Sequence, residues 1–457
     1  MNASDLARAP SVRKTATDIL VKVDVRRAFG DVLLHHALDG AVWDDRDRGL
    51  LTELVYGTLR WRGRLDAELG SLTRHPLEKA DPFLRNLLRL SLYQLRFLDR
   101  IPPYAIINEA VALAKAGGRT RAGGFVNAVL RSALRDRSAI AAPDPKAATI
   151  AALAEYWSHP PWLVAKWLEM FGAEETAALL AASNQPSPLI LRANALKGTR
   201  EELVNLFRDN GIDASPTPWS PQGILLRSAS LVTRLPGFDS GRFQVQGEAS
   251  QLVGFLLGPQ PGERILDACA APGGKATHIA EQMGDKGEVA AADISITGLE
   301  KITANARRLG LGSIKALKAD FTKPLPPVLA AKSYDRVLVD APCSGLGTLR
   351  SHPEIKWQRS EKDIERAAQL QGRILDRAAA LLKPGGALVY STCTLTCEEN
   401  ETVIADFLAN HRGFVLDEAT EYLPAQAKSL AQGRYFLALP QRHNTDGFFA
   451  ARMRKVN

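Results

Sequence analysis

Hydrophobic side chains recur at helical spacing through most of the first 140 residues. In Asp47–Trp61 the apolar positions 50, 51, 54, 55 and 59 form one stripe along an α-helix. The same spacing predicts further helices at Ala16–Val25, Pro82–Phe97, Ile107–Ala116 and Phe125–Leu134. Segments typical of strands are scarce in this region. We therefore predict an all-α helical bundle domain over residues 12–142.

The pattern changes after the stretch AAPDPKAA, whose prolines and small residues are typical of a linker. Helical spacing returns from Pro161 to Ala182, and LILRAN at Leu189–Asn194 then predicts a strand. A helix over Arg200–Asn210 and a short strand over Gly223–Leu226 follow. These elements predict a small α+β insert over residues 155–240.

From about Gly262 onward, apolar strands alternate with amphipathic helices. The predicted strands are Arg264–Cys269, Glu288–Asp293, Ser313–Lys318, Arg336–Asp340 and Ala387–Ser391. The predicted helices are Lys275–Met283, Gly298–Leu309, Lys362–Leu382 and Glu399–Asn410. This alternation predicts a doubly wound parallel sheet, and so a Rossmann-like α/β domain over residues 241–456. Such sheets bind ligands beyond the carboxyl ends of their strands.

A glycine turn, DACAAPGGK, follows the first of these strands and opens the next helix. Gly273 and Gly274 let the backbone approach a ligand closely, and the helix N-terminus offers free N–H groups. The spacing is neither the G-x-G-x-x-G of dinucleotide enzymes nor the phosphate-binding G-x-x-x-x-G-K-[ST]. A nucleotide or an amino-acid carboxylate suits this turn.

Acidic residues fall at or just after the ends of successive strands. Asp293 is placed to accept hydrogen bonds from ribose hydroxyls, and Asp320 from an adenine amino group. Asp340 ends the fourth strand. A single aspartate at such a position is more often a helix cap or turn residue, but three beyond a glycine turn favour an adenosine-type site. Asp267 has a structural alternative, which is to hydrogen-bond backbone amides and hold the glycine loop.

Two of the four cysteines close successive strands in loops rich in small residues. Cys343 lies in DAPCSGLG and Cys393 in STCT, so both could face one pocket if their strands are neighbours. Cys269 and Cys397 are more typical of small core residues. Cys393 and Cys397 have no second pair and no histidine cluster at ligand spacing, so we expect no metal site.

Composition bears on location and partners. The chain has 58 Lys and Arg against 50 Asp and Glu, a net charge of +8, which favours a polyanionic partner. Six basic residues and one acid lie between Lys115 and Arg137. There is no apolar run of about 18 residues and no signal-peptide core before Lys14, and no cysteine precedes Cys269. We expect a cytoplasmic monomer without a membrane partner.

Three motifs, DACAAPGGK, VDAPCSGLGTLRSHPEIKW and YSTCTLTCEENE, together resemble the RNA cytosine-C5 methyltransferases of the NOL1/NOP2/Sun family. FQVQGEASQLV resembles the family segment before the first strand, with Gly247 where many members carry aspartate. The resemblance implies S-adenosylmethionine as cofactor. The implied cofactor contacts are Cys269, Ala270, Ala271, Pro272, Gly273, Gly274, Lys275, Asp293, Asp320 and Asp340.

The resemblance also assigns the two thiols. It implies that Cys393 is the nucleophile and that Cys343 assists product release. A thiolate that adds to C6 of cytosine makes C5 nucleophilic enough to take a methyl group. An acid near N3 would stabilise this adduct, with Asp340 as the candidate and Lys275 as a source of positive charge.

The helical region resembles the RNA-binding antitermination factor NusB, and the insert, with LRANALKGTREEL, resembles the family's RNA-contacting subdomain. This layout implies methylation of a cytidine in small-subunit (16S) ribosomal RNA. The alternatives are a non-catalytic ribosome assembly factor, action on another RNA, and a DNA cytosine methyltransferase, which Cys393 argues against. Trp357 is either a base-stacking residue or a core tryptophan.

Overall fold

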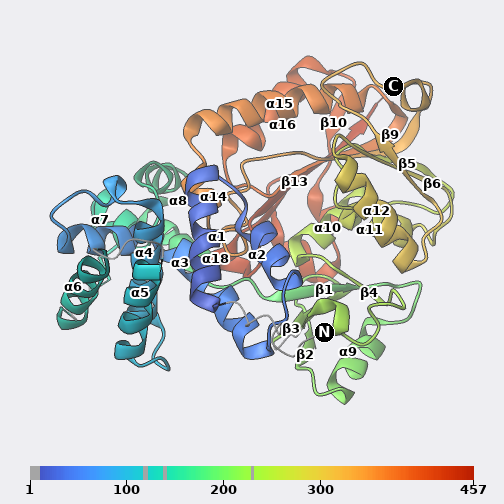
Figure 1. Ribbon diagram of the computed structural model, residues 1–457. Helices are drawn as coiled ribbons and strands as arrows, with labels where there is room; N and C mark the ends of the chain where they lie inside the picture. The colour runs from blue at the N-terminus through green and yellow to red at the C-terminus, as the bar shows by residue number, and fades with distance from the viewer. Residues whose placement is uncertain (1–10, 117–121, 137–141, 228–230, 457) are drawn as a thin grey trace. The chain divides into compact units, whose positions relative to one another are not determined.

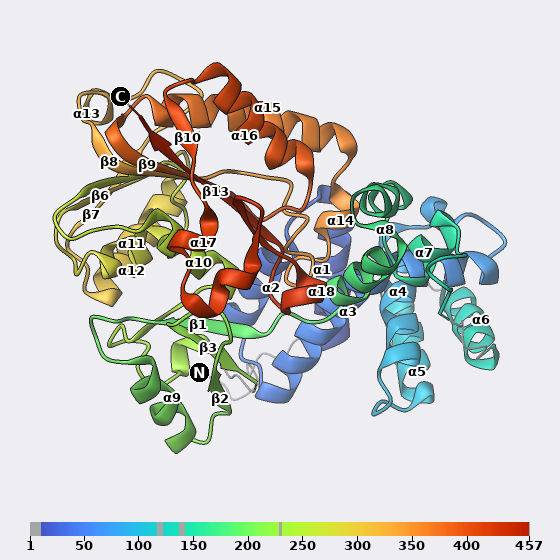
Figure 2. The ribbon, with the colours of Figure 1, turned by 180° about the vertical axis from the view of Figure 1, so that it is seen from behind.

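The computed structural model describes residues 11–116, 122–136, 142–227 and 231–456. The chain forms two compact units (Figures 1 and 2). The first, here called the helical unit, contains residues through Gln185 together with Leu349–Gln358. The second, the sheet unit, contains Pro186–Thr348 and Arg359–Asn457. In the described residues, no helix combines the length and apolar character needed to cross a bilayer.

The helical unit is built around α4, whose central turns are buried on most sides. An aspartate N-cap, Asp81, and a proline at the first helical position start this helix. The helices of the unit are α1 (Val12–Arg26), α2 (Gly30–Asp39), α3 (Asp45–Leu72), α4 (Pro82–Phe97), α5 (Pro103–Ala116), α6 (Ala122–Arg135), α7 (Ile150–Tyr156), α8 (Pro161–Ser183), α14 (Ile355–Gln358) and the 3₁₀ turn η1 (Leu77–Lys79). The predicted all-α bundle is confirmed.

Helices α2, α7 and the short α14 of this unit escaped prediction. Helix α2 buries only Gly30 and Leu34, so it carries little apolar periodicity, and α7 lies in the stretch after the expected linker. Helix α3 continues to Leu72, well beyond the expected end at Trp61. Of the six basic residues in the expected cluster, Lys115 lies in the last turn of α5, and Arg131 and Arg135 lie on α6. Arg119, Arg121 and Arg137 lie outside the described residues.

The segment Leu349–Gln358, hereafter the docked segment, leaves the sheet unit after β8 and packs within the helical unit. The Trp357 indole N–H donates to the Leu59 carbonyl at 3.1 Å. A Cβ added at Gly63 would lie 2.5 Å from the Trp357 ring, so this glycine makes room for the indole. Trp357 therefore packs against α3 while its side chain stays partly exposed.

Lys356 of the docked segment is fully buried. Its Nζ donates to the Arg60 carbonyl at 3.0 Å and to Asn184 Oδ1 at 3.1 Å. Burial lowers the pKa of Lys356 well below the ordinary lysine value. The side chain is thus an internal hydrogen-bond donor that fixes the docked segment to α3 and α8.

The sheet unit begins with a small α+β insert. Its sheet has the order β2-β3-β1-β4, all antiparallel, and α9 packs on it through Leu203, Val204 and Phe207. A complete capping box at Thr199 and Glu202 starts α9. The elements are β1 (Leu189–Ala193), α9 (Arg200–Asp209), β2 (Ala214–Pro216), β3 (Gly223–Leu226), η2 (Val232–Arg234) and β4 (Phe243–Val245).

The main sheet of this unit has nine strands, with the path β11-β12-β13-β9-β8-β5-β6-β7 and β10 paired to β13. The strands are β5 (Arg264–Asp267), β6 (Glu288–Asp293), β7 (Ile314–Lys318), β8 (Tyr334–Asp340), β9 (Leu382–Thr392), β10 (Phe414–Leu416), β11 (Ala431–Gln432), β12 (Tyr435–Ala438) and β13 (Phe448–Lys455). The helices are α10 (Glu248–Leu257), α11 (Gly274–Gln282), α12 (Ile296–Leu309), α13 (Pro327–Ala330), α15 (Glu361–Ala379), α16 (Glu401–Asn410), α17 (Ala419–Tyr422), α18 (Pro440–His443), η3 (Cys397–Glu399) and η4 (Ala425–Leu430).

Helices cover both faces of this sheet (Figure 1). Alternate strand residues point to opposite faces, so Ile265 packs with α10, α11 and α12, whereas Leu266 packs with α13, α15 and α16. Strands β7, β6, β5, β8 and β9 are parallel, which confirms the doubly wound arrangement. The expectation of an all-parallel sheet is wrong at one edge, where β13 pairs antiparallel with β9 and carries β10 and β12.

Candidate functional site

The predicted site residues lie along the carboxyl edge of the parallel strands, in the order that the topology dictates. Asp320 follows β7, Asp293 ends β6, the glycine loop follows β5, Asp340 ends β8, and Cys393 follows β9. Because Asp340 pairs directly with Ser391, the loops bearing Cys343 and Cys393 leave the sheet side by side. One edge of the sheet unit thus gathers the glycine loop, the three acids and two cysteines.

The glycine loop turns tightly into α11. Gly273 has φ +103°, a left-handed conformation that favours glycine, and a Cβ there would lie 3.2 Å from Ile302. In the described structure, no side chain caps the first turn of α11. The N–H groups of that turn therefore remain available to a ligand that carries negative charge.

Asp293 braces this loop from the neighbouring strand. Its Oδ2 accepts from the Ala271 N–H at 2.9 Å and its Oδ1 accepts from the Ser295 N–H at 2.8 Å. Each carboxylate oxygen keeps a second lone pair for a further donor. From the sequence, hydrogen bonding to the backbone amides of the glycine loop was an alternative role for Asp267. In the structure, Asp293 accepts such a hydrogen bond from Ala271.

Asp320 lies two residues beyond β7. Its Oδ1 accepts from the Thr322 N–H and hydroxyl, and these hydrogen bonds lower the pKa of Asp320 below the ordinary value. The carboxylate is therefore ionised, and Oδ2 lies 3.5 Å from Lys323 Nζ. An ionised acceptor at this strand end suits an amino or hydroxyl donor on a ligand.

Asp340 and Lys275 form an ion pair at the centre of the edge. Lys275 Nζ lies 2.6 Å from Asp340 Oδ2, and the Ser391 hydroxyl donates to Asp340 Oδ1 at 2.8 Å. Lys275 Nζ also lies 5.0 Å from the centre of the Phe448 ring. The pair places a cation and a carboxylate beside the cysteine loops, as the sequence analysis expected of Asp340 and Lys275.

Asp267 is completely buried beneath this edge. Burial and the nearby Asp340 carboxylate raise the pKa of Asp267 to about 8, although Lys275 and the Cys269 N–H oppose the shift. Neither carboxylate oxygen has a full hydrogen bond among the described residues. Burial and the surrounding carboxylates also raise the pKa of the Cys269 thiol, so Cys269 is not a reactive thiol.

Cys343 and Cys393 meet directly, with 3.3 Å between their sulfur atoms. The hydrogen bond to Cys393, burial and the Glu399 carboxylate raise the pKa of Cys343 well above the ordinary thiol value. Cys343 therefore holds its proton more tightly than an ordinary thiol. Either sulfur can be the donor in the contact between them.

Glu399, which the sequence analysis did not single out, holds the two cysteine loops together. It is fully buried and accepts from the Ser344 N–H at 2.8 Å and from the Thr396 hydroxyl at 2.8 Å. Gln371 of α15 donates to the same carboxylate at 3.0 Å. Ser344 follows Cys343 and Thr396 follows Cys393, so one carboxylate fixes the position of both sulfurs.

Arg192 of β1, in the insert, contacts both the glycine loop and α11. Its side chain is fully buried, forms an ion pair with Glu281 of α11 at 2.7 Å, and donates to the Gly274 carbonyl at 2.8 Å. Burial raises the pKa of Glu281, which the arginine opposes. Within the motif LRAN, this arginine therefore stabilises the glycine loop and α11.

Three family models match the chain. Residues 254–454 match the family described as 16S rRNA methyltransferase RsmB/F. Residues 10–135 match the NusB family, and residues 159–233 match the ferredoxin-like domain of RsmF/B-like methyltransferases. The three matches follow one another along the chain in the order of the predicted domains.

Whole-chain comparisons agree. A probable ribosomal RNA small subunit methyltransferase B of Synechocystis is 39% identical over 451 residues, which cover 98% of this chain and 100% of the relative. The crystal structure of PH0851 has a TM-score of 0.82 at 27% identity and covers 98% of this chain and 100% of its own. The crystal structure of NSun6 from Pyrococcus horikoshii with SFG has a TM-score of 0.58 at 25% identity, over 65% of this chain and 98% of that one.

The buried pair Arg192–Glu281 yields a stability prediction. Arg192→Met leaves an uncompensated buried carboxylate, so the free energy of unfolding should fall by about 3–5 kcal/mol. Arg227→Met, which breaks the exposed Arg227–Asp213 pair in the same insert, should cost no more than about 1 kcal/mol. Calorimetric thermal unfolding of both variants measures the difference. Equal unfolding temperatures for the two variants would show that the buried pair does not contribute more to stability than the exposed pair.

The raised pKa of Asp267 predicts a pH dependence. Folding raises this pKa from its ordinary value of 3.8 to about 8, so the folded protein binds a proton that the unfolded chain releases in that window. The contribution of Asp267 to the free energy of unfolding therefore falls as pH rises from about 4 to 8. The variant Asp267→Asn cannot ionise and so does not lose stability in this way. The unfolding temperature of Asp267→Asn minus that of wild type should therefore increase between pH 5 and pH 8. A constant difference across that range contradicts the assignment.

Proposed function

Because this chain belongs to the ribosomal RNA small subunit methyltransferase B family, we propose that it methylates C5 of a cytidine in 16S rRNA with S-adenosylmethionine, through a covalent adduct on Cys393. The observation that carries the proposal is the direct contact of two thiols at the strand ends that also bear the glycine loop and the acids. We place this activity in the cytoplasm.

The carboxyl edge of the sheet unit suits S-adenosylmethionine. The open first turn of α11 and the loop from Cys269 to Lys275 would hold the amino-acid end, with Gly273 leaving space for close approach. Asp293 would accept from the ribose hydroxyls and Asp320 from the adenine amino group. When bound, S-adenosylmethionine supplies an electrophilic methyl group. The related NSun6 structure with SFG, an analogue of this cofactor, supports the assignment.

The two thiols have different roles in the proposed reaction. Cys393 is the sulfur that loses its proton and adds as thiolate to C6 of the cytosine ring, and the C5–C6 double bond is lost. Electron density moves towards N3 and C5. Lys275 lies beside the cysteine loops and is placed to stabilise this charge. Asp340, which shares a proton with the Lys275 ammonium, is placed to pass that proton to N3.

Release reverses these steps. Once C5 carries the methyl group, a base removes the C5 proton, the C5–C6 double bond re-forms, and the bond between C6 and the Cys393 sulfur breaks. Cys343 stands 3.3 Å from that sulfur, so its S–H stabilises the departing thiolate. This gives Cys343 the release role that the family resemblance implies.

The RNA must present its base to the protein. C5 of a cytosine inside a helix is inaccessible, so the nucleotide is extruded or lies in a loop. The NusB-like helical unit and the ferredoxin-like insert would bind the surrounding RNA, in keeping with the net charge of +8.

The activity has a direct test. Labelled S-adenosylmethionine is incubated with unmethylated 16S rRNA, free or in small-subunit particles, and the product is mapped to the base. We expect label in 5-methylcytidine at one site with wild type, and at least a thousandfold less with Cys393→Ala, because this variant lacks the sulfur that forms the adduct. No transfer to either substrate by folded, cofactor-binding protein favours the assembly-factor alternative, and label in another RNA changes the substrate.

The division between the thiols is tested by Cys343→Ala. Without the thiol that assists release, this variant should accumulate a covalent protein–RNA complex that survives denaturing electrophoresis, and its turnover should fall. Cys397→Ala, at the exposed thiol outside the pair, is the matched control and should form no stable complex. If Cys343→Ala forms no adduct at all, Cys343 is the nucleophile.

A further inference from the structure

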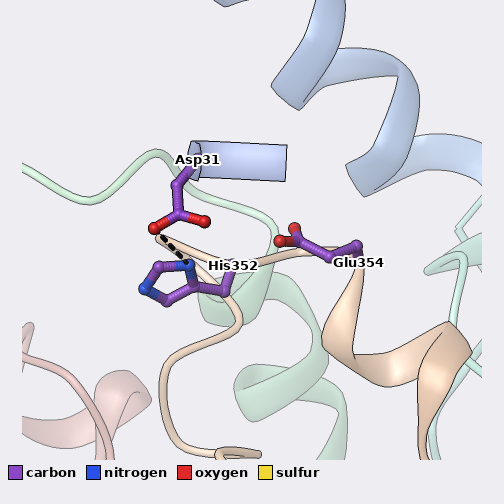
Figure 3. A group of neighbouring side chains, drawn as sticks. All are labelled: Asp31, His352 and Glu354. Atoms are coloured by element: carbon purple, nitrogen blue, oxygen red, sulfur yellow. Dashed lines mark ion pairs between the residues drawn. The ribbon is translucent and has the colours of Figure 1, made fainter. Parts of the chain in front are cut away.

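Three potential metal ligands from distant parts of the sequence meet within the helical unit. Asp31 lies on α2, and His352 and Glu354 lie on the docked segment. One donor atom from each side chain lies within 4.8 Å of the other two, and His352 Nδ1 lies 4.0 Å from Asp31 Oδ2. Figure 3 shows the two carboxylates and the imidazole turned towards one another.

The Glu354 carboxylate makes this group more than a surface cluster. Glu354 is only 1% exposed, and its Oε1 accepts from the Gly30 N–H at 2.9 Å. Its Oε2 is buried without a hydrogen-bond partner among the described residues, as is Asp31 Oδ1. Two neighbouring carboxylates that each keep a buried oxygen without a donor are costly, and a cation bound to both removes that cost.

We propose that Asp31, His352 and Glu354 bind a divalent transition-metal ion that fastens the docked segment to α2. One imidazole nitrogen with two carboxylate oxygens is a donor set typical of Zn²⁺ and its first-row neighbours, whereas Mg²⁺ and Ca²⁺ prefer oxygen donors alone. Asp31 and His352 are half-exposed, so water completes the coordination shell from the solvent side.

The geometry needs only a small adjustment. Ligands at about 2.1 Å from a tetrahedral ion lie about 3.4 Å apart, and the donor atoms here lie within 4.8 Å of one another. Glu354 is fixed by its hydrogen bond to Gly30, while the half-exposed Asp31 and His352 side chains are able to rotate inwards. The buried Glu354 positions the site, and the two partly exposed side chains complete it from the solvent side.

Sequence spacing could not reveal these ligands. Gly30 and Glu354, which share a hydrogen bond, are 324 residues apart, and His352 and Glu354 alone do not form a recognised ligand motif. The site exists only because the docked segment crosses into the helical unit. It is independent of the proposed methyl transfer and is therefore tested without RNA or S-adenosylmethionine.

The test is a titration of metal-free full-length protein with Co²⁺, followed by its visible absorption. We expect one tightly bound ion per chain with weak ligand-field bands and no thiolate-to-cobalt charge-transfer band, because the donors are nitrogen and oxygen. His352→Gln and Glu354→Gln should each weaken binding at least tenfold. Zn²⁺ in excess should raise the unfolding temperature of wild type and not that of His352→Gln.

Matched controls distinguish this site from incidental histidine binding. His411→Gln removes the histidine of a similar pair, His411–Asp376, which lacks a third ligand, and should leave Co²⁺ affinity unchanged. The double variant His35→Gln/His36→Gln removes exposed histidines of α2 and should also be neutral. Circular dichroism verifies that each variant folds. The proposal is overturned if wild type binds no ion, if a charge-transfer band locates the ion at the cysteines, or if His352→Gln binds as tightly as wild type.

Discussion

The contact between the sulfurs of Cys343 and Cys393 is the constraint on which the site depends. Two cysteines fifty residues apart reach 3.3 Å only because β8 and β9 are adjacent and parallel and end at the same level. Burial and this contact keep the proton on Cys343. A single carboxylate, Glu399, then ties both loops together, so the sheet sets the register and the glutamate sets the fine position.

The surroundings of this pair are built from charges that the sheet unit keeps out of water. Lys275 joins the glycine loop to Asp340, Arg192 joins the insert to α11, and Asp267 lies protonated beneath them at neutral pH. Burying each of these charged groups costs free energy. An ion pair, a hydrogen bond or a shift in pKa offsets that cost. The result is a rigid edge in which the glycine loop, the acids and the thiols have fixed positions before any ligand arrives.

Much of this was predictable because it is local in sequence. Apolar periodicity gave α4 its bounds from Pro82 to Phe97 and β6 its bounds from Glu288 to Asp293, and strand ends located Asp293, Asp340, Cys343 and Cys393. The antiparallel strands β10 to β13 escaped because they are mostly short and their pairing with β9 is long-range.

The remaining features also depend on tertiary contact. Nothing near Arg192 in the sequence indicates Glu281 as its partner, and nothing near Glu399 indicates Ser344. The histidine and acids at 31, 352 and 354 are likewise brought together by the fold alone. A charged residue inside an apolar strand, as in LRAN, is the one sequence signal that could have identified a buried support.

The central claim is that Cys393 is the attacking sulfur. The most direct measurement uses 16S rRNA that carries 5-fluorocytidine, in which fluorine at C5 replaces the proton that release requires, so the adduct is trapped with wild-type protein and S-adenosylmethionine. Mass spectrometry of the digested complex identifies the linked cysteine. The account predicts the nucleotide on the peptide that contains Cys393, and a nucleotide on the peptide that contains Cys343 would contradict it.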